Sequence, residues 1–291
     1  MLEDRDPHLF QDSAIVSVSW LSEKLNSPGL KLLDASWYLP TSPRNPHAEY
    51  VESHIPGALF FDIETITDPD STLPNTFPSP EIFSEKMGQL GISHTDTIVI
   101  YDREGVHSSP RGWWMFRQFG HRHVYVLDGG MHAWIQAGFR TEGGNVKLPS
   151  CHYVATSPGH LCDKGFVHQH LGKHQILDAR SRERFLGTAP EPRPGLPSGH
   201  IPHSVSLPSS MLTDPLSRRF KSEDQIKGVF EEVGVNLSQP IICTCGSGIG
   251  ACVVLLALHE TGHHDALLYD GSWTEWASDP AMPLNTSRPA A

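Results

Sequence analysis

The sequence lacks the features that mark nucleic-acid-binding and membrane proteins. Its 22 Lys and Arg residues are outnumbered by 33 Asp and Glu, so the formal net charge is −11. Nucleic acids and anionic membranes attract basic surfaces, and we therefore expect neither as a partner. No apolar run approaches the roughly 20 residues that cross a bilayer. The acidic first residues contain no hydrophobic leader segment, which predicts a cytoplasmic protein.

Cysteine is scarce, and the histidines form no recognisable metal motif. The five cysteines follow no regular spacing, and Cys243 and Cys245 are too close for a CxxC redox pair. This usage is typical of a reducing compartment. Histidine is plentiful, with 18 residues, but neighbours such as His121 and His123 have no third ligand at a zinc spacing. We therefore expect no metal site.

Two copies of one pattern follow each other along the 291 residues. Residues 32–36, 98–102 and 126–130 are matched by residues 176–180, 241–245 and 268–272. Each copy alternates short β-branched runs with amphipathic stretches, such as 81–90 and 222–233. This alternation predicts an α/β fold in which a mainly parallel sheet is flanked by helices on both faces. We predict tandem domains at 11–142 and 163–291, joined by a Gly-, Pro- and Ser-rich linker at 143–162.

Cys245 is the residue that the sequence most strongly indicates for chemistry. It ends a β-rich run, three glycines follow it within five residues, and an apolar helical stretch begins directly afterwards. Such a loop can point its backbone N–H groups inward at the thiol. A helix N-terminus favours the thiolate, so Cys245 should be a nucleophile. The alternative is a buried structural thiol, which would need no glycine-rich loop.

The two copies differ at this position. Asp102 occupies the place of Cys245 in the first copy, and the following loop, residues 103–110, has a different sequence. We therefore expect a first domain without a nucleophile and a catalytic second domain. Ligands of such sheets bind beyond the carboxyl ends of the strands, here in a cleft between the domains.

Several motifs together resemble the two-domain rhodanese superfamily, and within it the 3-mercaptopyruvate sulfurtransferases. They are the repeat itself, the segment SSPRGWWMFR at 108–117 and the CGSG loop at 245–248. The resemblance covers nearly the whole chain. It implies that Cys245 takes sulfur from 3-mercaptopyruvate as a persulfide and releases pyruvate. The sulfur then passes to cyanide or to a thiol such as thioredoxin or a small thiol, without a cofactor.

The resemblance also assigns roles to the loop and to two arginines. The loop residues Gly246, Gly248, Ile249 and Gly250 would surround the persulfide with N–H groups, and Ser247 would either add a catalytic hydroxyl or cap the helix. Thiosulfate-using relatives carry basic residues directly after the cysteine, whereas this loop is neutral.

Arg184 and Arg193 fall on the family positions that hold the carboxylate and carbonyl of mercaptopyruvate. A guanidinium suits a carboxylate because it can bond with two N–H groups. The alternative is that they form surface salt bridges with Glu183 and Glu191.

The first domain departs from the family pattern. A relay of aspartate and histidine in the relatives corresponds to Glu64 and Asn75, and an expected tyrosine corresponds to His107. Asparagine cannot shuttle a proton, whereas His107 titrates near neutral pH and could supply one. Two alternatives therefore stay open: a thiosulfate-preferring rhodanese, and a persulfide carrier with little turnover of small donors. We expect a monomer.

Overall fold

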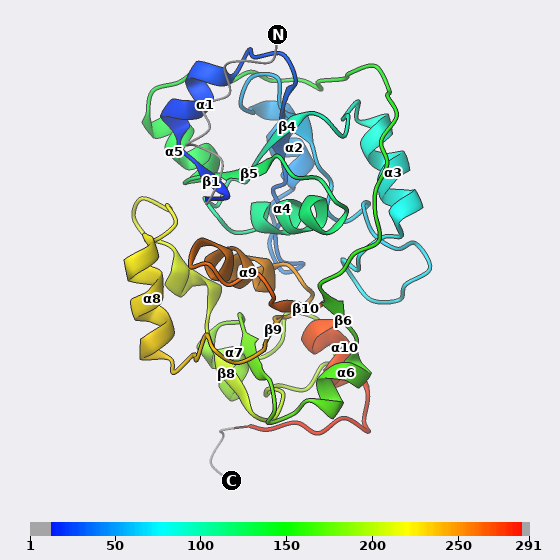
Figure 1. The fold of residues 1–291 in the computed structure, drawn as a ribbon, viewed down its shortest axis with the longest axis vertical. Helices are drawn as coiled ribbons and strands as arrows, with labels where there is room; N and C mark the ends of the chain where they lie inside the picture. Colours follow the sequence, from blue (N-terminus) through cyan, green and yellow to red (C-terminus); the bar gives the residue numbers. More distant parts are fainter. Residues whose placement is uncertain (1–12, 287–291) are drawn as a thin grey trace.

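The computed structural model describes residues 13–286, which form two five-stranded parallel sheets, one in each half of the chain (Figure 1). The strand order is β1-β5-β4-β2-β3 in the first sheet and β6-β10-β9-β7-β8 in the second. The orders are equivalent and the registers correspond: Leu33 lies opposite Ile100, and Leu177 lies opposite Cys243. The predicted α/β class and the tandem repeat are confirmed.

The strands are short, in agreement with the short β-branched runs of the sequence. Those of the first sheet are β1 (Ile15–Val16), β2 (Leu30–Asp34), β3 (Leu59–Phe60), β4 (Thr97–Tyr101) and β5 (Val124–Leu127). Those of the second are β6 (Leu161–Cys162), β7 (Gln175–Asp178), β8 (Ser204–Ser206), β9 (Ile241–Thr244) and β10 (Leu267–Tyr269).

Helices flank each sheet, and several begin at capping residues. In the first half they are α1 (Val18–Lys24), α2 (Pro46–Glu52), α3 (Pro80–Gln89), α4 (Ser109–Gln118) and α5 (Gly130–Gln136). In the second half they are α6 (Lys164–Gln169), α7 (Arg182–Leu186), the short 3₁₀ helix η1 (Ser209–Leu212), α8 (Glu223–Glu232), α9 (Gly250–Glu260) and α10 (Ser272–Ser278). Ser79 caps α3, and Ser222 with Gln225 forms a capping box on α8.

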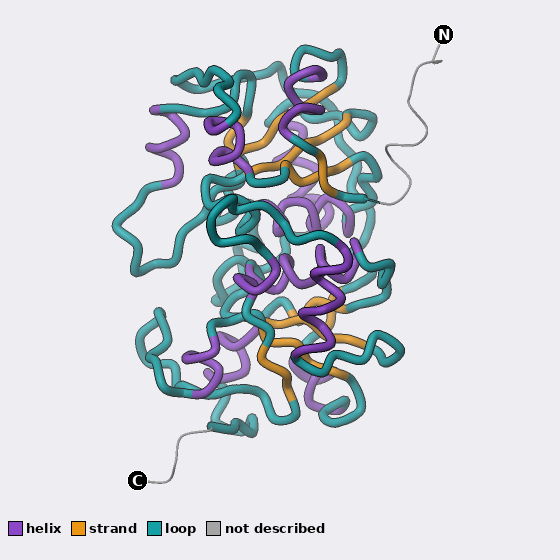
Figure 2. The backbone as a smooth tube through the Cα atoms, turned by 90° about the vertical axis from the view of Figure 1, so that its left-hand side faces the viewer, coloured by secondary structure: helices purple, strands orange, loops and turns teal. Residues whose placement is uncertain are grey.

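Both faces of each sheet are buried, which explains the continuous apolar strands. Along β4, Ile98 and Ile100 face the largest hydrophobic cluster, whereas Val99 and Tyr101 face a second cluster on the other side. The largest cluster contains residues of both halves, because α4 and α9 contact each other between the two sheets (Figures 1 and 2). This contact places the loop before α9 next to the first half of the chain.

The predicted linker is well packed. Tyr153 is buried and stacks on His121 with ring centroids 5.9 Å apart, and the N–H of Ala155 donates to Oγ of Ser84 at 2.9 Å. Residues 161–162, at the end of the predicted linker, form β6. The domain boundaries themselves stay a prediction.

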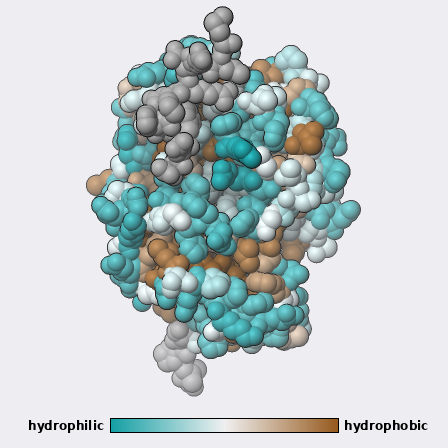
Figure 3. All heavy atoms as spheres, viewed as in Figure 1, coloured by the Kyte–Doolittle hydropathy of each residue, from teal (hydrophilic) through white to brown (hydrophobic). Residues whose placement is uncertain are grey.

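Figure 3 shows a mostly hydrophilic face with a hydrophobic band across its lower half. Within residues 13–286, no helix combines the length and the apolar character that crossing a membrane requires.

Candidate active site

Cys245 lies at the carboxyl end of β9, a central strand of the second sheet, and is 5% exposed. The loop turns between this residue and the first residue of α9, Gly250. Gly248 has φ of +80°, a conformation that side chains with a Cβ rarely adopt. The sequence pattern thus produces a tight strand-to-helix loop, at the edge where parallel sheets bind ligands.

Part of the loop backbone is held by the start of α10. Oγ of Ser272 accepts the N–H of Cys245 and the N–H of Gly248, both at 3.2 Å. The carbonyl of Cys245 accepts the N–H of Trp273 at 3.0 Å. The predicted ring of inward N–H groups is therefore wrong at Gly248, whose N–H is bound by a side chain that sequence reasoning did not identify.

The other loop N–H groups remain available. Within residues 13–286, no acceptor is found for the N–H of Gly246, Ser247, Ile249 or Gly250. These four donors follow Cys245 and precede or begin α9, so they can stabilise negative charge on sulfur.

A cavity of about 410 Å³ opens in front of this loop, and both halves of the chain contribute to it. It brings together one predicted residue of the first half, His107, with seven of the second: Arg184, Arg193, Cys245, Gly246, Ser247, Ile249 and Gly250. Trp37, which the sequence did not indicate, also contributes. The residues that matter below are Cys245, Ser247, Arg184, Arg193, His107 and Trp37.

Arg184 lines this cavity and is also ion-paired. Its Nη2 lies 2.5 Å from Oε2 of Glu191, and its Nε donates to Oε1 of the same carboxylate at 3.2 Å. A Cβ at position 246 would lie 2.9 Å from Nη2 of Arg184, so the guanidinium rests on the loop. The salt bridge with Glu191 considered in the sequence therefore exists, but it is partly buried and lies inside the candidate site.

Arg193 differs from Arg184 because no ion pair with a carboxylate is found for it within residues 13–286. Burial lowers the pKa of Arg193, while negative charge on Cys245 raises it. The guanidinium of Arg193 therefore lies within electrostatic range of the Cys245 thiol. An anionic substrate would gain from this unpaired guanidinium.

Asn75 reaches the loop from the first half of the chain. Its Nδ2 donates to Oγ of Ser247 at 3.1 Å, and both residues are buried. Asn75 has φ of 59°, which asparagine tolerates better than most residues. Because Ser247 accepts this bond, its own proton is free to donate elsewhere. The N-cap of α9 is Ile249, so the alternative role of Ser247 as a helix cap is wrong.

A buried arginine connects the segment of Asn75 to the second half of the chain. Nη1 of Arg111, on α4, lies 2.7 Å from Oδ1 of Asp270 and 3.3 Å from the carbonyl of Gly248. Its Nη2 donates to the carbonyl of Asn75. Sequence reasoning missed Arg111, although an arginine directly before the apolar run at residues 112–116 is a detectable signal.

Glu64 does not line the cavity directly. Its Oε1 accepts the Nε1–H of Trp37 at 3.0 Å, and its charge raises the pKa of Arg193 as a minor contribution after burial and Cys245. Glu64 can therefore orient the indole of Trp37, which lines the cavity.

The two halves contact each other through equivalent loops. The N–H of Phe77 donates to Oδ2 of Asp270 at 2.7 Å, and the N–H of Phe220 donates to Oδ1 of Asp128 at 2.9 Å. Two residues before these phenylalanines, Asn75 and Arg218 have φ of 59° and 56°. The contact that reaches Ser247 thus has a symmetric counterpart in the half without a nucleophile.

In the first half of the chain, the loop after β4 binds the carboxylate of Asp102. Oδ2 of Asp102 accepts the N–H groups of His107, Ser108 and Ser109 at 2.8–3.0 Å and the hydroxyl of Ser109 at 2.6 Å. In the first copy, an aspartate therefore occupies the position that the thiol has in the second copy. Because the loop of the first copy already binds this carboxylate, it cannot bind an external anion.

The glycines of the loop predict different mutational effects. In Gly248→Ala, the new Cβ would lie 2.8 Å from Oδ1 of Asp270 and 2.9 Å from Nη1 of Arg111, at an unfavourable φ. We expect the free energy of unfolding, measured by urea denaturation, to fall by about 2 kcal/mol or more. Gly250→Ala is the matched control, because its nearest contact would be 3.7 Å from Cβ of Cys245. It should be neutral or stabilising by up to about 1 kcal/mol. Equal losses would contradict this account.

Comparison with known proteins supports this picture. The rhodanese-like domain model matches residues 17–137 and 165–279. The 3-mercaptopyruvate sulfurtransferase of Rattus norvegicus is 43% identical over 288 residues, which cover 93% of each chain. Thiosulfate/3-mercaptopyruvate sulfurtransferase 1, mitochondrial, of Arabidopsis thaliana is 39% identical over 94% of this chain and 78% of that protein.

A solved structure agrees with these sequences. The crystal structure of SseA from Escherichia coli, described as a 3-mercaptopyruvate sulfotransferase with the rhodanese fold, superposes with a TM-score of 0.82. It is 36% identical and covers 90% of this chain and 99% of its own. The chain therefore belongs to the family of rhodanese-like domain proteins, with two such domains in tandem.

Proposed function

We propose that this chain is a 3-mercaptopyruvate sulfurtransferase that works through a persulfide on Cys245. One observation carries the proposal: a single cavity holds the thiol, the unpaired cation of Arg193 and the guanidinium of Arg184 beside a loop without charged side chains. The donor must therefore carry its own anionic group at a distance from the transferred sulfur. A carboxylate next to a carbonyl, as in 3-mercaptopyruvate, meets this requirement.

The first half-reaction moves one sulfur atom. The Cys245 thiolate attacks the sulfur of 3-mercaptopyruvate, an S–S bond forms, and the C–S bond of the substrate breaks. The electron pair of that bond leaves as the enolate of pyruvate, which takes up a proton at carbon. The free N–H groups of the loop stabilise the anionic sulfur, and the hydroxyl of Ser247 can donate to the substrate because Asn75 binds its oxygen.

The second half-reaction restores the enzyme. An acceptor thiolate, or cyanide, attacks the outer sulfur of the persulfide, and the S–S bond breaks to regenerate the Cys245 thiolate. His107 lines the cavity, which supports a role for this side chain in proton transfer there. The thiol acceptor, such as thioredoxin or a small thiol, the cytoplasmic location and the monomeric state stay predictions of the sequence.

A comparison of two donors tests the proposal. Pyruvate release from 3-mercaptopyruvate with a dithiol acceptor is measured beside thiocyanate formation from thiosulfate and cyanide, with Cys245→Ser as the blank. We expect the first reaction to exceed the second at least about tenfold in kcat/KM, or about 1.4 kcal/mol. The reverse preference would show a thiosulfate enzyme, and blank-level rates with both donors would indicate a persulfide carrier.

A further inference from the structure

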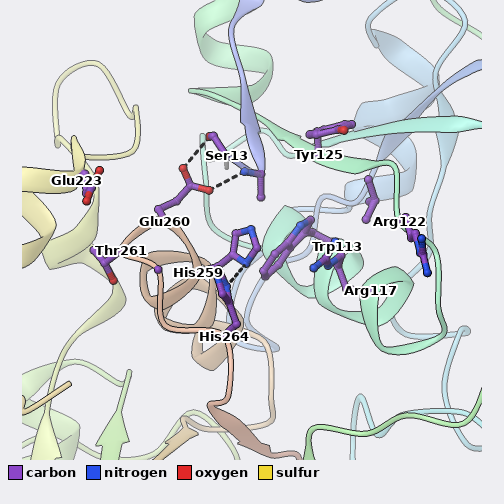
Figure 4. A pocket seen from close by; sticks show the side chains of 13 residues that line it. Ser13, Trp113, Arg117, Arg122, Tyr125, Glu223, His259, Glu260, Thr261 and His264 are labelled. Atoms are coloured by element: carbon purple, nitrogen blue, oxygen red, sulfur yellow. Dashed lines mark hydrogen bonds between the residues drawn. The ribbon is translucent and has the colours of Figure 1, made fainter. Parts of the chain in front are cut away.

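A second cavity, of about 660 Å³, lies where α4 meets the C-terminal end of α9. Among the described residues, none that lines it also lines the cavity of Cys245. It adjoins a hollow of about 520 Å³, which Figure 4 shows from close by. We call the two cavities together the arginine groove. The residues that line both cavities are Trp113, Arg117, Arg122, Tyr125, His259 and His264.

The charge of the larger cavity is opposite to that of the whole protein. No Asp or Glu is among the described residues that line it, although the chain carries a net charge of −11. Arg117 and Arg122 both line it, and no salt bridge to either is found within residues 13–286. Burial lowers the pKa of Arg117, and the charge of Arg122 lowers it further. The two guanidinium groups therefore repel each other, and an anion between them would relieve this repulsion.

The carboxylates of the adjoining hollow already have partners. Glu260 accepts the N–H of Ala14 and the hydroxyl of Ser13, each at 2.7 Å, as the dashed lines in Figure 4 show. Glu223 is bonded to Lys227 at 2.5 Å. Within residues 13–286, neither carboxylate forms a salt bridge with Arg117 or Arg122.

The indole groups of the groove are also unsatisfied. Nε1 of Trp113 and Nε1 of Trp114 are buried, and no hydrogen-bond partner is found for them in the described part of the chain. Both side chains line the cavity and are at most 6% exposed. An indole N–H can only donate, so each of these groups calls for an acceptor.

The neighbouring histidine adds no charge at neutral pH. Burial, followed by the nearby Arg117 and His264, lowers the pKa of His259 to about 4. Its ring lies 5.3 Å from that of Trp113, and its Nδ1 is 3.0 Å from Nδ1 of His264. Arg117 and Arg122 are the only Arg or Lys side chains among the described residues that line the groove.

We propose that the arginine groove binds a small oxyanion, a molecule whose phosphate or carboxylate groups lie between Arg117 and Arg122. Arginine forms paired hydrogen bonds with both kinds of group. The cavity is within the size range of small-molecule sites. The inference is independent of the sulfur-transfer proposal, because the groove and the cavity of Cys245 share no residue within 13–286.

Isothermal titration of the full-length protein tests this site with two probes, pyrophosphate for phosphate groups and citrate for carboxylates. We expect at least one to bind, and Arg117→Gln and Arg122→Gln each to weaken it by about tenfold or more. The control is Arg140→Gln, an exposed arginine outside the groove, which should leave the affinity unchanged.

A third variant separates the groove from the active site. Arg193→Gln should keep the affinity for the probe, while Arg117→Gln should keep the rate of pyruvate release. The proposal is overturned if neither probe binds, or if binding is lost in Arg193→Gln and retained in the Arg117→Gln and Arg122→Gln variants.

Discussion

Replacement of Arg111 by methionine is expected to lower the free energy of unfolding by about 3–5 kcal/mol. Arg111 is 1% exposed and is bonded to Asp270, to the carbonyl of Gly248 and to that of Asn75. Burial by itself lowers the pKa of Arg111, and Asp270 together with Cys252 more than reverses this effect. Removal of the cation leaves the buried end of Asp270 and two carbonyls without their donor, at the contact between the two halves.

Urea denaturation of Arg111→Met is the measurement. Arg117→Met, on the exposed side of the same helix, is the matched control and should change the unfolding free energy by no more than about 0.5 kcal/mol. The contact also positions the catalytic loop, so Arg111→Met should lower kcat under conditions where it is folded. A loss of stability no larger than that of the control would contradict the proposed role.

Arg193→Gln is expected to reduce kcat/KM for 3-mercaptopyruvate by about 100-fold, which corresponds to about 2.7 kcal/mol. Glutamine removes the cation of the cavity that has no ion pair among the described residues, but retains a polar side chain. If Arg193 binds the carboxylate equally in the ground state and the transition state, the loss will be mainly in KM.

Steady-state pyruvate release checks this result. Arg182→Gln, an exposed arginine on α7, is the control and should keep the activity of the unmodified protein. Arg184→Gln is a poorer test of substrate binding, because it also deprives the buried carboxylate of Glu191 of a partner. Full activity in Arg193→Gln would remove the electrostatic argument for mercaptopyruvate as the donor.

The fold and the position of the nucleophile could be predicted because both are encoded locally. Residues 241–252 contain the strand, the glycine loop and the start of the helix in one continuous run, so no distant contact is needed to place Cys245 at a strand end. The repeat is likewise visible as matching segments, and equivalent segments form equivalent strands.

The partners of the predicted residues could not be predicted in the same way. Arg184 and Arg193 both line the cavity, yet one is paired with Glu191 and the other is not. Which arginine retains an available charge depends on the path of residues 187–193, which carry no regular periodicity. Ser272 was missed for a similar reason, since a serine at the start of a helix usually indicates a cap.

The sequence by itself determined the α/β class, the tandem repeat and the thiol in a glycine loop, because periodicity and turn chemistry act over short stretches of chain. Only the tertiary structure decided that Asn75 donates to Ser247, 172 residues away, and that Arg111 and Asp270, 159 residues apart, hold that contact. Hydrogen bonds between distant segments depend on the packing of α4 against α9, and no local pattern encodes which polar groups that packing brings together.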